Sequence, residues 1–130
     1  MTDATNRWHL RGSAGHTYSG AKAGRLLWHR RDWATLDTWF ESDAGRLLNV
    51  VTNGRRAMVV LLDGEGDPGE HLVDPRAGGT SDGYPLSNGQ VDSHADRDTV
   101  PFDVAARAVG HFIEHDTWPA DVAVEDDRGE

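Results

Sequence analysis

The sequence contains no cysteine, and this absence removes several kinds of chemistry at once. It excludes disulfide bonds, metal sites built on thiolates, and the zinc site of nucleic-acid deaminases, which needs a pair of cysteines. The motifs G-x-x-x-x-G-K-[ST] and G-x-S-x-G are also missing, and no serine lies in a context that suggests an activated nucleophile. The residues by themselves indicate no catalytic constellation.

Long apolar runs are absent as well. No segment approaches the roughly 20 apolar residues of a membrane span, and residues 1–10, MTDATNRWHL, lack the apolar core of a signal peptide. We therefore expect a cytoplasmic protein. The 130 residues fit one domain, with residues 1–6 and 126–130 expected to be disordered.

The whole chain has a net charge of −9, and basic residues are scarce in its second half. Residues 1–62 hold nine basic and five acidic groups, residues 63–98 two basic and nine acidic, and residues 99–130 two basic and eight acidic. The acidic excess therefore begins directly after residue 62. Such a field repels nucleic acid and attracts a basic partner, although a solvated surface that aids solubility explains the composition equally well.

The chain is organised around residues 56–74, RAMVVLLDGEGDPGEHLVD. The apolar run 57–62 has a length typical of a strand buried on both faces. Asn53-Gly54 separates it from a second strand at 47–52 and predicts a type I′ hairpin turn. Glycines and a proline turn the chain before a third strand at 70–74. We predict a three-stranded antiparallel meander with an acidic loop at one end.

The flanking segments predict two helices. Pro101 suits the first position of a helix that runs to about residue 115, followed by a strand through Val122 and Val124. Asp32 suits the N-cap of a helix over 33–42, preceded by a strand at 26–29 and, earlier, a short edge strand at 7–11. The apolar face of the 101–115 helix is predicted to comprise Phe102, Ala105, Ala106, Val109, Phe112 and Ile113.

A second Asn-Gly pair at residues 88 and 89 predicts a polar hairpin of strands 83–87 and 90–94, near an edge or a binding surface. Together these elements indicate an α+β fold, with one mostly antiparallel sheet of about five to seven strands and two main helices packed on it.

Two metal-binding alternatives remain open. HFIEH at residues 111–115 matches the H-x-x-E-H pattern of inverted zinc proteases, with His111, Glu114 and His115 as the residues of a small zinc-dependent hydrolase. Its helical phase, however, points these side chains away from the apolar face. Alternatively, the acidic loop that starts at Asp63 has partial calcium-loop spacing, although Pro68 replaces the required glycine and strands are expected to flank it.

From residue 45 onward the chain resembles immunity protein family 1 of bacterial polymorphic toxin systems. The strand 57–62 and DGEGDPGEHLVDP at 63–75 carry the resemblance, together with SNGQVDSHADRDTVPFDVAARAV at 87–109 and HFIEHDTWPADVAV at 111–124. The resemblance implies an α+β fold, no cofactor and no enzymatic activity. It also implies a role as an inhibitor that binds a cognate toxin, often one with a nucleic-acid deaminase domain.

The charge pattern independently predicts where such a partner binds. A toxin that acts on nucleic acid needs a basic surface, which clustered carboxylates attract. The expected partner is therefore a basic protein, without direct nucleic-acid or membrane contact, and Tyr84 is the expected anchor. The predicted partner-binding residues are Asp63, Glu65, Asp67, Glu70, Asp82, Tyr84, Asp92 and Asp96.

Overall fold

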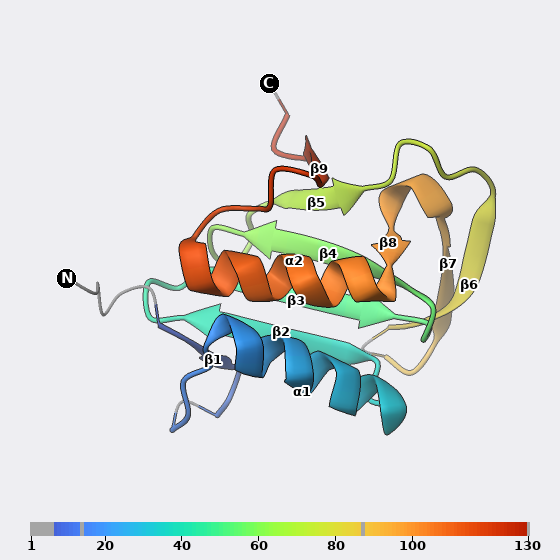
Figure 1. Cartoon of the computed structure of the whole chain (residues 1–130). Helices are drawn as coiled ribbons and strands as arrows, with labels where there is room; N and C mark the ends of the chain where they lie inside the picture. Colours follow the sequence, from blue (N-terminus) through green and yellow to red (C-terminus); the bar gives the residue numbers. More distant parts are fainter. Residues whose placement is uncertain (1–6, 14, 87, 130) are drawn as a thin grey trace.

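The computed structural model describes residues 7–13, 15–86 and 88–129. Within these residues a seven-stranded antiparallel sheet carries two helices on one face, so the predicted α+β class is confirmed (Figure 1). The strand order is β1-β2-β3-β4-β5-β9, and β8 pairs with β4. The elements are β1 (Trp8–Leu10), α1 (Gly20–Asp32), β2 (Asp37–Ser42), β3 (Leu47–Thr52), β4 (Arg56–Leu62), β5 (Glu70–Val73), β6 (Thr80–Pro85), β7 (Val91–Ala95), the 3-10 helix η2 (Asp96–Asp98), β8 (Val100–Pro101), α2 (Phe102–His115) and β9 (Ala123–Asp126).

The predicted meander is confirmed as β3, β4 and β5, which pair at the centre of the sheet. The turn between β3 and β4 is not the predicted type I′ turn, because Gly54 has a positive φ of 95° and Asn53 does not. Instead, the side-chain oxygen of Asn53 accepts hydrogen bonds from the N–H groups of Arg55 and Arg56, each at 2.9 Å. A side chain that mimics a backbone acceptor therefore closes this turn.

β4 is buried on one face, not on both as its apolar run indicated. Ala57, Val59 and Leu61 point toward the helices and are at most 1% exposed. Met58 and Val60 alternate with them and are half-buried on the opposite face. The hydrophobic core therefore lies between the sheet and the helix layer.

α2 supplies a buried apolar face to this core, as predicted. The helix begins at Phe102, with Pro101 as its N-cap, and Asp116 ends it in the left-handed conformation with a φ of 61°. All residues of the predicted apolar face are buried, namely Phe102, Ala105, Ala106, Val109, Phe112 and Ile113.

Between residues 20 and 42 our prediction is wrong. Helix α1 occupies the segment where we expected a strand at 26–29, and strand β2 lies within the segment where we expected a helix at 33–42. Ser19 is the N-cap of α1, accepting a hydrogen bond from the Lys22 N–H, whereas Asp32 is the last residue of that helix. Histidine and arginine side chains in the last turn of α1 complement the negative partial charge of a helix C-terminus.

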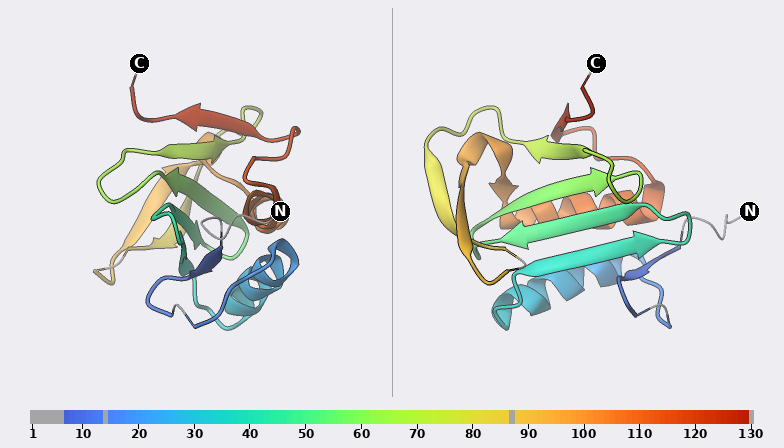
Figure 2. Two further views of the ribbon diagram at one scale, coloured as in Figure 1. Left: turned by 90° about the vertical axis from the view of Figure 1, so that its left-hand side faces the viewer. Right: turned by 180° about the vertical axis from the view of Figure 1, so that it is seen from behind.

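The predicted polar hairpin is confirmed as β6 and β7, a separate two-stranded sheet at one end of the molecule (Figure 2). The Asn53 side chain donates a hydrogen bond to the Asp82 carbonyl at 2.9 Å and so links β6 to the turn after β3. Arg56 on β4 donates to Thr99 Oγ1 at 2.7 Å and to the Asp74 carboxylate at 2.8 Å. Polar contacts therefore fasten both ends of the hairpin segment to the main sheet.

The C-terminal segment is structured, where we expected disorder over residues 126–130. β9 reaches Asp126 and pairs with β5, and the Asp127 N–H donates to the Gly69 carbonyl at 2.8 Å. Residues 1–6 and 130, also predicted to be disordered, lie outside the described residues. No described helix is both long and apolar enough to cross a membrane.

Candidate functional site: an acidic edge of the sheet

The acidic loop between β4 and β5 folds around one arginine. Arg128, which follows β9, lies 2.8 Å from Glu70, 3.0 Å from Asp67 and 3.4 Å from Asp63. Asp67 also accepts a hydrogen bond from the Asp63 N–H at 2.8 Å, which closes the loop on itself. The C-terminal segment therefore holds the loop in position.

These contacts shift two protonation equilibria. The backbone N–H of Asp63, assisted by the Arg128 guanidinium, holds the pKa of the Asp67 carboxyl below its ordinary value. Glu70 and then Asp67 raise the pKa of Arg128. Both groups therefore remain charged at neutral pH, and the loop remains an ionic structure.

Two further arginines border the same loop. Arg46 pairs with Asp63 at 3.3 Å and with Asp116 at 2.9 Å. Arg11 pairs with Glu65. These pairs neutralise part of the predicted acidic surface, because each arginine offsets one of the carboxylates that it contacts.

A second group of carboxylates surrounds His71 on β5. The imidazole Nδ1 lies 2.6 Å from Asp127, and Nε2 lies 3.1 Å from Asp98 and 3.8 Å from Glu125. Arg97 also contacts Asp98 and Glu125, at 3.2 and 3.3 Å. Burial acts to lower the pKa of His71, but the hydrogen bonds and charges of Asp127 and Asp98 outweigh it and raise the pKa. The protonated imidazole is therefore favoured among these carboxylates.

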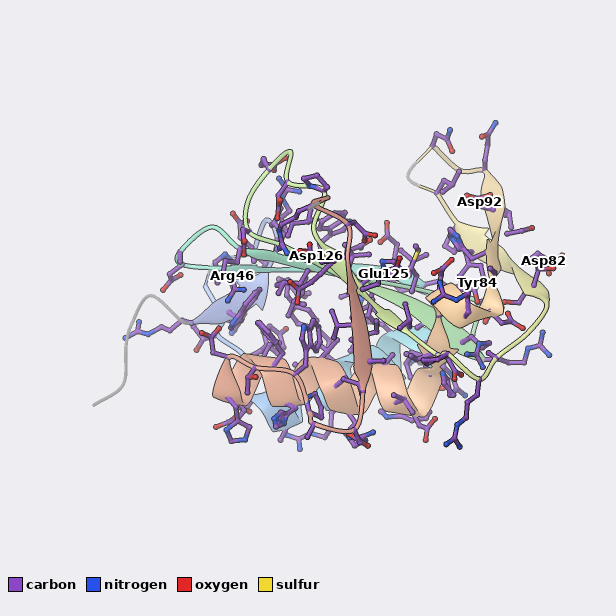
Figure 3. The ribbon with its side chains drawn as sticks, turned by 90° about the horizontal axis from the view of Figure 1, so that it is seen from above. Arg46, Asp82, Tyr84, Asp92, Glu125 and Asp126 are labelled. Atoms are coloured by element: carbon purple, nitrogen blue, oxygen red, sulfur yellow. The ribbon has the colours of Figure 1, made fainter. Side chains whose placement is uncertain are left out.

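The two groups meet along β9. In the β5–β9 register, Asp126 lies opposite Glu70 and Glu125 lies opposite His71. Asp126 also contacts Arg128 at 3.2 Å. Figure 3 looks down on this edge, with Glu125 and Asp126 along β9. We call the following carboxylates the acidic edge: Asp63, Asp67, Glu70, Asp98, Glu125, Asp126 and Asp127.

The predicted partner residues of the second hairpin do not join this edge. Asp82 and Asp92 are exposed on β6 and β7, at the end of the molecule opposite Arg46 (Figure 3). Tyr84 is fully buried, with its hydroxyl 2.8 Å from Ser81 Oγ, so its side chain is not available as the anchor that we predicted. The half-buried Asp96 faces Arg56, with 4.0 Å between Oδ1 and Nε.

One residue of the zinc alternative, Glu114, has a structural role. Glu114 accepts a hydrogen bond from the Gly20 N–H at 3.0 Å and so satisfies a free donor at the start of α1. His111 and His115, with ring centroids 4.6 Å apart, border the groove between the two helices. In the loop of the calcium alternative, the carboxylates of Asp63 and Asp67 form ion pairs with arginines. Strands flank this loop, as we expected.

Across the part of the chain that the structure describes, one group of histidine and acidic side chains places its ligand atoms within 4.8 Å of one another. It consists of His71, Asp98 and Glu125. Asp98 already receives contacts from both His71 and Arg97, and His71 Nδ1 contacts Asp127. Ion pairs account for this arrangement.

Sequence reasoning missed four members of the acidic edge: Asp98, Glu125, Asp126 and Asp127. The last three form a continuous acidic run, and that run is the signal that marks a charged surface. We predict disorder for Asp126 and Asp127 from the sequence, because their pairing partner, the β5 segment, lies about fifty residues earlier and no local pattern connects the two.

Comparisons of the chain with protein-family models, with curated proteins and with solved structures found no match. The function is therefore argued from the geometry and charge of the acidic edge itself.

Proposed function

We propose that the chain is an immunity protein that binds and neutralises a cognate bacterial toxin. The proposed toxin acts on nucleic acid, with a deaminase as the favoured class because of the resemblance of residues 45–130. The observation that carries the proposal is the acidic edge, where the β4–β5 loop, β5, η2 and the β9 segment bring seven carboxylates together.

The charge of this edge supports a basic protein partner. Seven carboxylates face Arg128, Arg97, Arg46 and His71, so the edge keeps a negative excess even when the histidine is protonated. A toxin that acts on nucleic acid presents basic side chains where it contacts phosphates. The opposite electrostatic potentials of the two surfaces accelerate association and orient the two proteins, although each exposed ion pair adds little affinity.

The proposed mechanism is stoichiometric inhibition without catalysis. Ion pairs within the chain hold the carboxylates in place before the partner arrives, so less side-chain entropy is lost on binding. A partner bound across the acidic edge would have its phosphate-binding surface covered. The nucleic acid then cannot reach the toxin, because the immunity protein occupies that surface and its carboxylates repel the phosphates.

The test is co-purification of the chain with the product of an adjacent toxin gene, at low and at moderate salt. We expect a one-to-one complex whose association slows as salt rises, because screening weakens the long-range attraction. Failure to form a complex at both salt concentrations would overturn the proposal.

A matched pair of variants locates the surface. Glu125→Lys with Asp126→Lys reverses the acidic edge, and Asp82→Lys with Asp92→Lys makes the same change in net charge on the second hairpin. We expect the first variant to lose the complex and the second to retain it. The reverse pattern would move the interface to β6 and β7.

A further inference from the structure

β9 is a free edge of the main sheet. The strand order ends at β9, and no described element lies beyond it in any of the ribbon views (Figures 1 and 2). The other edge strand, β1, is covered by the segment that follows it. The Tyr18 N–H donates to the Trp8 carbonyl at 2.8 Å, and Ser13 forms a bridge with Leu10.

The register shows which backbone groups of β9 are unused. The Asp127 N–H donates to the Gly69 carbonyl, so Asp127 and Gly69 form a hydrogen-bonded pair. Such pairs alternate with non-bonded pairs along an antiparallel ladder. Asp126 and Val124, which lie opposite Glu70 and Leu72, therefore direct their N–H and C=O groups away from β5.

Exposed edges of this kind accept an added strand. Charge selects the occupant, because Glu125, Asp126 and Asp127 line the edge and are all exposed. A second copy of this chain would place these carboxylates against one another, which disfavours self-pairing. A basic, extended segment could pair its backbone N–H and C=O groups with the unpaired groups of β9, and its positive charges would complement the carboxylates.

We infer that β9 binds an extended basic segment of the toxin as an additional antiparallel or parallel strand, with backbone hydrogen bonds to Val124 and Asp126. This inference rests on the proposed function and names how the acidic edge holds its partner. The added strand forms hydrogen bonds with the backbone of β9. The carboxylates on both faces of β9 favour a strand with basic side chains.

The experiment compares two substitutions at one position, using the full chain and the adjacent toxin gene product. Val124→Pro removes the outward N–H, which the β5–β9 ladder does not use, while Val124→Ala keeps the N–H and shortens the side chain. We expect the proline variant to weaken the complex by about tenfold or more, the equivalent of one or two lost hydrogen bonds. The alanine variant should bind nearly as tightly as the unsubstituted chain.

Amide exchange measured by NMR on the unsubstituted chain provides a second readout that does not depend on the folding of a variant. The N–H groups of Val124 and Asp126 should exchange rapidly in the free protein and become protected in the complex. Protection of neither, with normal binding by Val124→Pro, would overturn the strand-addition inference while the proposed function stands.

Two other outcomes separate the inference from the function. Charge reversal at Glu125 and Asp126 could abolish the complex while Val124→Pro has no effect. That result would indicate binding through side chains without backbone pairing and would overturn strand addition. Absence of any complex with the unsubstituted chain would overturn the proposed function and this inference with it.

Discussion

At the scale of single residues, His71 joins three segments of the chain. It lies on β5 and contacts Asp127 after β9 and Asp98 in η2. Its pKa is raised above the ordinary value of 6.5, so the folded protein binds this proton more tightly than the unfolded chain does. The resulting stabilisation is fully present below the unfolded pKa and is lost as the pH rises through the raised folded pKa.

We therefore predict that the free energy of unfolding falls as the pH is raised above the ordinary histidine pKa of 6.5, measured by urea denaturation. The variant His71→Gln should lose most of this pH dependence. His16→Gln, at an exposed position, is the control and should keep it. A flat profile for the unsubstituted chain would show that the ring proton does not couple to folding.

Arg128 is the second residue on which the acidic edge depends, because it is the cation shared by Asp63, Asp67 and Glu70. Replacing it with glutamine leaves these carboxylates to repel one another. We predict a lower urea midpoint for Arg128→Gln, with a larger loss at low salt than at high salt, where repulsion is screened.

The control for this prediction is Arg107→Gln, which removes an exposed arginine that pairs with Asp121. Its midpoint should change little, because an isolated surface pair contributes little to stability. Equal effects of the two substitutions, or a loss independent of salt, would argue against a shared-cation role for Arg128.

At the scale of elements, two glycines set the contact between α1 and α2. A Cβ added at Gly110 would lie 2.7 Å from the Gly20 carbonyl oxygen, and one at Gly20 would lie 2.3 Å from the Gly110 oxygen. Both contacts are with backbone, which cannot rotate away as a side chain can. The helices would have to move apart over the sheet to accept either substitution.

We predict that Gly110→Ala lowers the free energy of unfolding by about 1 to 3 kcal/mol, despite the better helix propensity of alanine. Gly24→Ala is the matched control, because its Cβ would lie 3.6 Å from the Ala106 oxygen, an ordinary contact. That variant should be as stable as the unsubstituted chain, or more stable by up to about 1 kcal/mol. Equal stability of the two variants, measured by urea denaturation, would contradict the close crossing.

The elements that were predicted wrongly show where local pattern is ambiguous. Trp33, Leu36 and Phe40 have helical spacing, but Thr38, Phe40 and Ser42 also alternate as a strand requires, and these three are buried in β2. Pairing with β1 and β3 decides between the two patterns. The pairing with β3 is local, but the pairing with β1 joins Trp8 to Ser42, and no short window contains that contact.

At the scale of the whole molecule, charge is distributed unevenly. The first two turns of α1 carry Lys22 and Arg25. Helix α1 packs on the β1–β2 side of the sheet, whereas the acidic edge follows β9 at the opposite side (Figure 1). The protein is therefore polarised, and its net charge of −9 understates the field at one edge.

This arrangement predicts that position matters more than net charge. Lys22→Ala with Arg25→Ala makes the chain more negative by two charges, yet it should leave the salt-dependent association rate with the proposed toxin nearly unchanged. Charges farther apart than a Debye length, about 10 Å at 0.1 M salt, are largely screened. A marked acceleration, measured by stopped-flow mixing, would show instead that overall charge drives the encounter.

The sequence by itself determined the meander at residues 47–74 and the α2 face, because each depends on patterns within one short window, and its composition excluded thiol chemistry. It also indicated that the second half of the chain is acidic. Tertiary structure alone decided that Asp126 lies opposite Glu70, that Arg128 enters the loop at Asp63, and that Tyr84 is buried. The first two outcomes depend on the pairing of β9 with β5, a contact between distant segments whose register is set by the folded sheet and by no local signal. The burial of Tyr84 depends instead on how the β6–β7 hairpin lies against the end of the main sheet.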